Sequence, residues 1–202
     1  NRNTIFEHAL VTATEVILGL VIGTILGTVT AIQLALFRTA ERLILPILVF
    51  TQAVPVFALA PLLTLWFGYG IGSKIVMTVL IIFFPVTSAF HDGLTRTDNR
   101  FHDLAQSMSA RKVNFMWHVQ IPSALPDLGT GLKLAAVYAP IGAVIGEWVG
   151  ASKGLGYLML LANGRAKIDL MFASLIVLAC LTVILHIAVG RLANWLTRYT
   201  QG

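Results

Sequence analysis

Five long apolar stretches are the feature that most limits what this chain can fold into. An α-helix needs about 20 mainly apolar residues to cross a bilayer. These stretches lack the apolar–polar alternation of a membrane β-barrel, so helices are expected. They run over Ala9–Leu36, Leu43–Phe67, Ile75–Phe90, Leu128–Gly146 and Leu170–Gly190. The chain is therefore predicted to be an all-α membrane protein, a polytopic helical bundle with five spans.

Composition excludes the main soluble classes. The 202 residues are 57% apolar and 11% charged, with a mean hydropathy of +0.83. Soluble domains carry about 25% charged residues, and disordered chains are poor in apolar ones. The net charge of +5 would suit nucleic acid in a soluble protein. In a membrane protein, basic residues collect in cytoplasmic loops, so we expect contact with lipid and none with nucleic acid.

The distribution of basic residues predicts the orientation. Five spans place nine Lys and Arg residues on the side that holds the C-terminus, against five on the other side. By the positive-inside rule, the C-terminus and the loop His91–Pro126 are expected to be cytoplasmic. An odd number of spans then leaves residue 1 outside, and we expect a further span before Asn1.

Sequence motifs for enzyme chemistry are absent. No GxxxxGK[ST] motif occurs, so the chain is not expected to bind ATP phosphates. Its five histidines show no HExxH spacing, and Cys180 is the single cysteine, which argues against a metal site. We therefore predict no catalytic residue, no metal and no cofactor in this chain.

Two glycine ladders suggest close helix packing. In each, a glycine recurs every fourth residue, which lays a flat strip along one face of a helix. Tight packing is the primary interpretation, and lining of a substrate path is the alternative. The ladders are Gly19, Gly23 and Gly27, and Gly142, Gly146 and Gly150.

Polar groups inside the spans are candidates for a substrate pathway. Ionisable residues there are functional by default, which singles out Glu15 and, beside Trp148, Glu147. A carboxylate and an aromatic ring could hold a polar heterocycle; the alternative for Glu147 is a solvated interfacial carboxylate. Gln52 and Tyr138 are uncharged polar residues in apolar runs. They are expected to line the pathway or to bond polar groups of other helices.

The loop His91–Pro126 contains a segment with helical periodicity. Asp103–Val119 is predicted to form an amphipathic helix that Pro122 and Pro126 end. Such a helix either lies on the membrane surface or docks into a groove of another protein. Asp103 could also serve only the helix dipole.

The stretch DLAQSMSARKVNFMWHVQIPSALP, residues 103–126, resembles the coupling segment of bacterial ABC importer permeases. The family pattern is Glu-Ala-Ala, three residues, Gly, and an apolar-Pro pair about a dozen residues later. Leu104 and Ser109 stand where the pattern has Ala and Gly, and that Gly breaks the helix into two short pieces. Arg111 and Lys112 are expected to contact either the ATPase or lipid phosphates. The remaining residues of the resemblance are Asp103, Ala105, Ala110 and the pair Ile121-Pro122.

The resemblance covers nearly the whole chain. AVPVFALAPLLTLWFGYGIGSK (residues 53–74) and GEWVGASKGLGYLM (residues 146–159) resemble the permeases for sulfonates, taurine, nitrate and thiamine or riboflavin precursors. Residues 138–167 look most like the members assigned to hydroxymethylpyrimidine. The resemblance implies a type I, MetI-like permease fold, a single transmembrane domain over residues 1–202, and the bacterial inner membrane.

The resemblance also implies partners. These are a dimer of cytosolic ATPases that binds ATP and Mg, a second permease subunit that is expected to be another copy, and an extracytoplasmic substrate-binding protein. Two alternatives stay open: a gradient-driven transporter or channel, and a membrane scaffold that only recruits partners.

Overall fold

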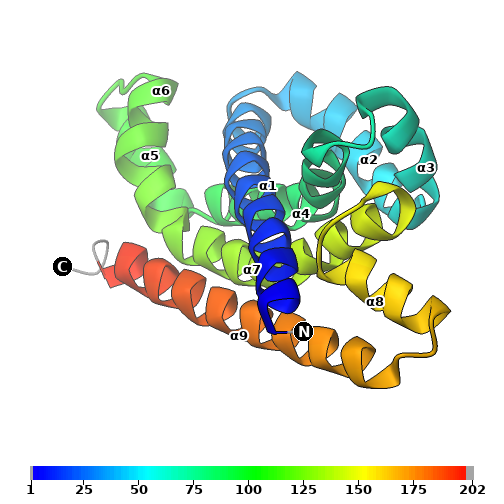
Figure 1. Cartoon of the computed structure of the whole chain (residues 1–202). Coiled ribbons are helices and arrows are strands. Elements are labelled where there is room, and N and C mark those ends of the chain that lie inside the picture. The colour runs from blue at the N-terminus through cyan, green and yellow to red at the C-terminus, as the bar shows by residue number, and fades with distance from the viewer. Residues whose placement is uncertain (1, 199–202) are drawn as a thin grey trace.

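The computed structural model describes residues 2–198, and every regular element within them is a helix (Figure 1). The elements are α1 (Arg2–Leu36), α2 (Arg38–Ala53), α3 (Val56–Phe67), α4 (Ile71–Thr95), α5 (Asn99–Ser107), α6 (Lys112–Phe115), η1 (Met116–Gln120), α7 (Ile121–Gly150), α8 (Leu155–Gly164) and α9 (Ile168–Arg198). Here η1 is one wider, π-helical turn, and it joins α6 to α7 without a break.

Four helices are long and apolar enough to cross a membrane alone: α1, α4, α9 and the continuous stretch Lys112–Gly150. The predicted span Leu43–Phe67 is instead the pair α2 and α3, bent by 100°. The bend lies at Val54–Pro55, where Val54 is extended (φ −81°, ψ 122°). A proline disfavours the helical conformation in the residue before it and lacks an N–H group. Counted as one broken span, the pair brings the number to five.

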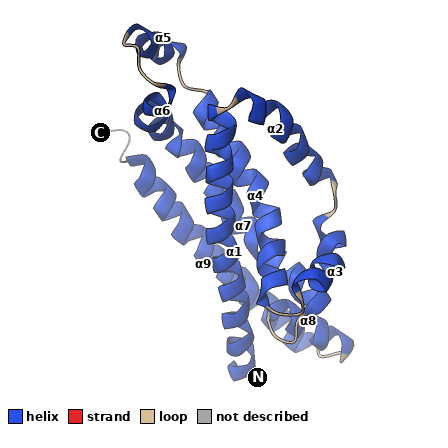
Figure 2. Cartoon of the chain, turned by 90° about the horizontal axis from the view of Figure 1, so that it is seen from above, coloured by secondary structure: helices blue, strands red, loops and turns tan. Residues whose placement is uncertain are grey.

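The connections give two distinct ends to the bundle (Figure 2). α1 runs toward the end that carries α5 and α6, α2 and α3 return, and α4 runs back toward α5 and α6. α7 then returns to the end where α8 lies, and α9 brings the chain back. We call these the α8 end and the α5–α6 end. The last described residues of α9 lie at the α5–α6 end.

The core centres on α4, which packs between α1 and α7. The glycine ladder of α1 and the first two glycines of the α7 ladder face it, whereas Gly150 faces Thr64 of α3. A Cβ atom on Gly19 would lie 2.5 Å from Thr78 Cγ2, and one on Gly142 would lie 2.6 Å from Thr78 Cα. Gly23 and Gly27 meet α4 in the same way one and two turns further on. The glycines thus let the backbones of both α1 and α7 approach α4 closely.

The expectation of one helix over Asp103–Val119 is wrong. α5 ends at Ser107, and the next helix begins only at Lys112. Pro122 and Pro126 do not end this segment either, because both lie inside α7. The π-helical turn directly precedes Pro122, where the usual α-helical hydrogen bond cannot form. Such a turn widens the helix and lets it continue past the proline.

Candidate coupling and pathway sites

The predicted coupling residues project from the α5–α6 end. Asp103, Ser109, Arg111 and Lys112 are exposed, and Ala105 is half-buried. Asp103 lies in the middle of α5, and the first turn of α5 holds no acidic residue. The helix-dipole interpretation of Asp103 therefore fails, because that effect fades within the first turn.

Ser109 ends α5 in a left-handed conformation, with φ +52°. The N–H of Ala110 donates to the Ala105 carbonyl at 2.9 Å, and the N–H of Ser109 donates to Gln106 at 3.0 Å. This pair of bonds is a Schellman cap, whose left-handed position is usually glycine. The serine at the position where the family pattern has Gly thus still breaks the segment sharply.

An apolar hollow of about 230 Å³ separates α5 from α6 and η1. Phe101 and Met108, on its rim, are 51% and 73% exposed. Asp103 and Arg111 are exposed charged residues of the same segment. Such a mixture of exposed apolar and charged groups is typical of a surface that receives a protein partner.

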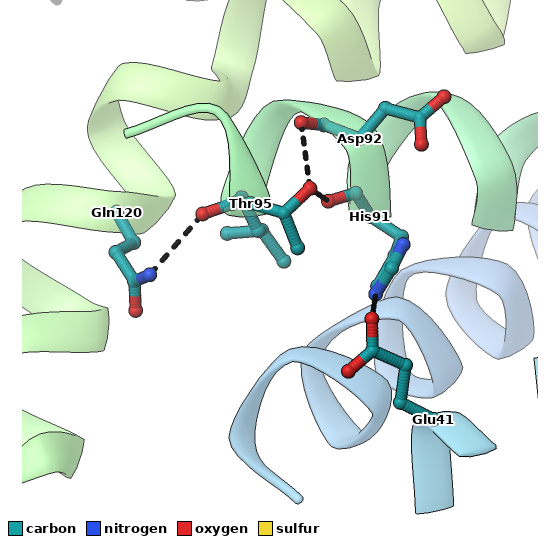
Figure 3. A network of polar contacts seen from close by, with 6 residues as sticks. Glu41, His91, Asp92, Thr95 and Gln120 are labelled. Atoms are coloured by element: carbon teal, nitrogen blue, oxygen red, sulfur yellow. Dashed lines mark hydrogen bonds and ion pairs between the residues drawn. The ribbon is translucent and has the colours of Figure 1, made fainter. Parts of the chain in front are cut away.

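Polar contacts connect this segment to the spans (Figure 3). The side-chain amide of Gln120, in η1, donates to the Leu94 carbonyl of α4 at 3.1 Å. On the far side of α4, His91 Nε2 lies 3.6 Å from Glu41 Oε1 of α2. Because α6 continues into α7, a displacement of the segment would reach α7 directly, α4 through Gln120 and α2 through Glu41.

A buried charged cluster lies at the other end, around Lys74. Gly19, Gly23 and Gly27 of α1 each meet a residue of α4 that lies four positions after the previous one. Continued back by one turn, the same pairing places Glu15 opposite Lys74. The contacts with α7 place Gly146 against the same lysine. Lys74 is 1% exposed, and Glu15 and Glu147 are 3% and 1% exposed. One ammonium group thus lies among two carboxyl groups from different spans.

The ammonium of Lys74 binds backbone carbonyls of two separate connections. It donates to Tyr69 at 2.7 Å and to Gly70 at 2.9 Å, both just before α4. It also donates to Gly150, the last residue of α7. A cation stabilises the C-terminal end of a helix, where carbonyls lack partners within the helix. Lys74 therefore holds the start of α4 to the end of α7.

The first turn of α8 is capped by side chains from two other helices. Glu147 accepts a hydrogen bond of 2.6 Å from the Thr12 hydroxyl and one of 2.5 Å from the Gly156 N–H. Thr12 in turn accepts from the Leu155 N–H at 2.8 Å, and His8 Nδ1 accepts from the Gly154 N–H at 2.9 Å. The free N–H groups of a helix start thus find partners inside the membrane region.

The four predicted pathway residues do not form one site. Gln52 lies at the bend between α2 and α3, where it lines a hollow of about 320 Å³. Tyr138, on α7, is 40% exposed, and Trp148 is 51% exposed beside α8 and α9. Glu147 is occupied by contacts within the chain, so its proposed contact with substrate stays a prediction.

Sequence reasoning missed Lys74, which lies one residue before the predicted span Ile75–Phe90. Lys74 shares a helix face with Thr78, Ile82 and Val86, but this spacing does not distinguish a buried lysine from one in the headgroup region. All four face the glycines of α1 or α7. Thr12 and His8 carried no comparable signal, because their partners lie more than 130 positions away.

Comparisons with known proteins identify the family of this chain. Residues 19–200 match the family described as "Binding-protein-dependent transport system inner membrane component". A probable ABC transporter permease of Haemophilus influenzae is 48% identical, covering 95% of this chain and 77% of that protein. The formylaminopyrimidine transport permease ThiX of Halalkalibacterium halodurans is 36% identical, covering 96% and 78%.

A solved structure shares the fold. It is a chain of the MetNI methionine ABC transporter in an inward-facing conformation, with a TM-score of 0.73, 20% identity, and 96% and 95% of the two chains covered. The predicted MetI-like, all-α membrane fold is confirmed. Family and fold together describe a transport component with no catalytic domain. The chain belongs to the inner membrane components of binding-protein-dependent transport systems, the multi-pass permease subunits of ABC importers.

Proposed function

We propose that this chain and a second copy form the membrane pathway of an importer for a small polar pyrimidine. The observation that carries this substrate class is the 36% identity to a formylaminopyrimidine transport permease over 96% of the chain. Riboflavin and taurine permeases are also similar, at 32% and 29% identity. A hydroxymethylpyrimidine-type thiamine precursor is the proposed cargo, ahead of taurine, other sulfonates and nitrate.

The α5–α6 end is the proposed cytoplasmic end, with the C-terminus on the same side. There Asp103, Ala105, Ser109, Ala110 and Arg111 would contact a cytosolic ATPase that binds ATP and Mg. Pro122 belongs to the same pattern but lies inside α7, so we assign it to the shape of the helix. An extracytoplasmic binding protein would deliver the substrate at the α8 end.

Coupling would use the continuous helix Lys112–Gly150 as a lever. A push on α6 moves α7 as one piece, because no loop separates them. α7 packs on α4 along most of its length, so the two move together. The ATPase can bias the pathway only if it contacts the inward- and outward-open states differently.

The bend between α2 and α3 is the proposed contact for the substrate. Its hollow of about 320 Å³ is lined mainly by apolar side chains, with Gln52 and Thr51 as polar groups. Known ligand pockets begin at about 300 Å³ and combine apolar walls with a few polar groups. Broken helices at membrane depth also expose backbone groups to a passing solute.

Substrate class can be tested in vesicles that contain the permease, its ATPase and its binding protein. We expect labelled formylaminopyrimidine or hydroxymethylpyrimidine to accumulate only with ATP and binding protein, and labelled taurine to stay outside. Accumulation of taurine in place of the pyrimidines would contradict the substrate. Uptake that follows an ion gradient without ATP would contradict the coupling.

The coupling surface can be tested separately by an Asp103→Lys variant. Charge reversal at a protein contact disfavours the partner strongly, so we expect the ATPase retained in a mild-detergent pull-down to fall by about tenfold or more. Asp92→Lys is a matched control, because Asp92 is exposed at the same end but lies outside the segment. Equal retention by both variants would refute the contact.

A further inference from the structure

A second hollow lies at the α5–α6 end, between the coupling segment and the junction of α1 with α2. Its volume is about 420 Å³. Figure 2 shows this junction and α5–α6 at the same end of the bundle. Part of its wall is apolar, with Leu36 from α1 and Phe115 from α6. The polar part of its wall consists of Arg38, Gln106, Lys112 and Gln120.

Every polar side chain of this wall can donate hydrogen bonds. All four polar side chains carry N–H groups, two of them are cations, and no acidic residue is among the described residues that line the hollow. Gln120 uses its amide toward Leu94. Within residues 2–198, no ion pair compensates Arg38 or Lys112. The hollow therefore has unbalanced positive charge and unused donors, the features of an anion site.

The position of the hollow indicates where the anion comes from. Leu36 is the last residue of a membrane-spanning helix, and Arg38 begins the next helix two residues later. The hollow thus lies where hydrocarbon gives way to headgroups. Basic pockets between membrane helices bind the phosphates of anionic lipids. The apolar wall would face the glycerol and the first part of the acyl chains.

We propose that this hollow binds the phosphate of an anionic phospholipid, with Arg38 and Lys112 as the two cationic ligands. The lipid would connect α6 to the α1–α2 junction. Between the described residues, no side-chain hydrogen bond or ion pair joins these two parts of the chain. The sequence left open whether Arg111 and Lys112 contact the ATPase or lipid phosphates, and the hollow assigns one residue to each. Lys112 binds lipid, and Arg111, which does not line the hollow, is left for the ATPase.

The test uses the permease–ATPase complex in nanodiscs and measures retained lipid by native mass spectrometry. One arm titrates phosphatidylglycerol into phosphatidylcholine, and a second adds inorganic phosphate as a competitor. Each hydrogen bond between a cationic side chain and the phosphate contributes about a tenfold gain in binding. We therefore expect Arg38→Gln with Lys112→Gln to weaken phosphatidylglycerol binding by about 100-fold, whereas Arg38→Lys with Lys112→Arg should keep most of it.

Arg42→Gln with Arg100→Gln removes the same charge from the same end and serves as the control, because both residues are exposed and outside the hollow. We expect this pair to change binding by about fivefold or less, because neither side chain lines the hollow and each acts on the phosphate only through screened attraction. An equal loss in both pairs would overturn the site. Full displacement of lipid by millimolar inorganic phosphate would overturn the lipid source. The proposal does not depend on the imported substrate, so either can fail alone.

Discussion

At the α8 end, four helices meet around a buried ammonium group, whereas at the α5–α6 end the segment contacts the spans through a few partly exposed bonds. Lys74 and Glu147 have several partners each, all within the chain. The half-buried Gln120 side chain has one partner, the Leu94 carbonyl. Buried charges cannot exchange a lost partner for water, but exposed ones can. The α8 end is thus held rigidly, whereas the α5–α6 end can rearrange at low free-energy cost. A segment that a partner protein moves needs this freedom.

The largest effect is expected from Lys74→Met. The change removes the only cation near two buried carboxyl groups among the described residues. The carbonyls of Tyr69 and Gly150 lose its hydrogen bonds, whereas that of Gly70 keeps the Ser73 hydroxyl. Breaking a buried charged cluster by removing one member costs about 3–5 kcal/mol. Thermal unfolding in detergent should show this loss, or folded protein should be absent. Lys153→Met, an exposed lysine at the same end, is the control and should behave as wild type.

A smaller loss is expected when a glycine facing α4 gains a methyl group. In Gly142→Ala the new Cβ would lie 2.6 Å from the Thr78 backbone, so α4 and α7 must separate. Overpacking of this kind costs about 1–3 kcal/mol. Gly72→Ala, where a Cβ meets nothing within 4 Å, should leave stability within about 0.5 kcal/mol of wild type. Equal melting temperatures of the two variants would contradict the close approach.

These two predictions also show what the sequence could and could not provide. The apolar runs and glycine spacing predicted the spans, because both follow from the chain's own periodicity. The buried role of Lys74 did not follow, because a lysine at the edge of an apolar run is equally suited to the headgroup region. Only the register of α4 against α1 and α7 distinguishes the two, and that register is set by tertiary packing.

The bend between α2 and α3 shows the same limit. The predicted span Leu43–Phe67 contains Pro46, Pro55 and Pro61, and each lacks the same N–H group. The structure keeps Pro46 and Pro61 inside helices and breaks the chain only at Pro55. Local chemistry is nearly identical at the three positions, so neighbouring elements decide which proline breaks the helix.

At the α5–α6 end, Gln120→Ala should separate stability from coupling. One neutral hydrogen bond contributes about 1 kcal/mol, so the melting temperature should change little. Loss of the bond to Leu94 would let α6 and η1 move without α4. We expect less substrate transported per ATP hydrolysed in reconstituted vesicles. Gln33→Ala, an exposed glutamine on α1, should leave this ratio unchanged; a wild-type ratio in Gln120→Ala would refute the link.

The smallest effect is expected at two helix caps that resemble each other closely. Ala166 ends α8 as Ser109 ends α5, with φ +53° and the same pair of bonds, from Ala166 to Asn163 and from Lys167 to Ala162. A left-handed conformation costs a non-glycine residue about 1–2 kcal/mol, and glycine loses about 0.5–1 kcal/mol more in conformational entropy on folding. Ser109→Gly and Ala166→Gly should therefore each stabilise the local turn by about 0.5–1 kcal/mol.

Hydrogen exchange of the amides around each turn would measure this gain directly, because such a small change is lost in a global melting curve. Only Ser109 lies in the coupling segment, so Ser109→Gly should also keep or slightly raise ATPase retention, whereas Ala166→Gly should not change it. A Ser109→Val variant, with a branched side chain in a left-handed conformation, should lose the cap and the ATPase together. If Ser109→Val retains the ATPase as wild type does, the sharp break after α5 is not what the partner recognises.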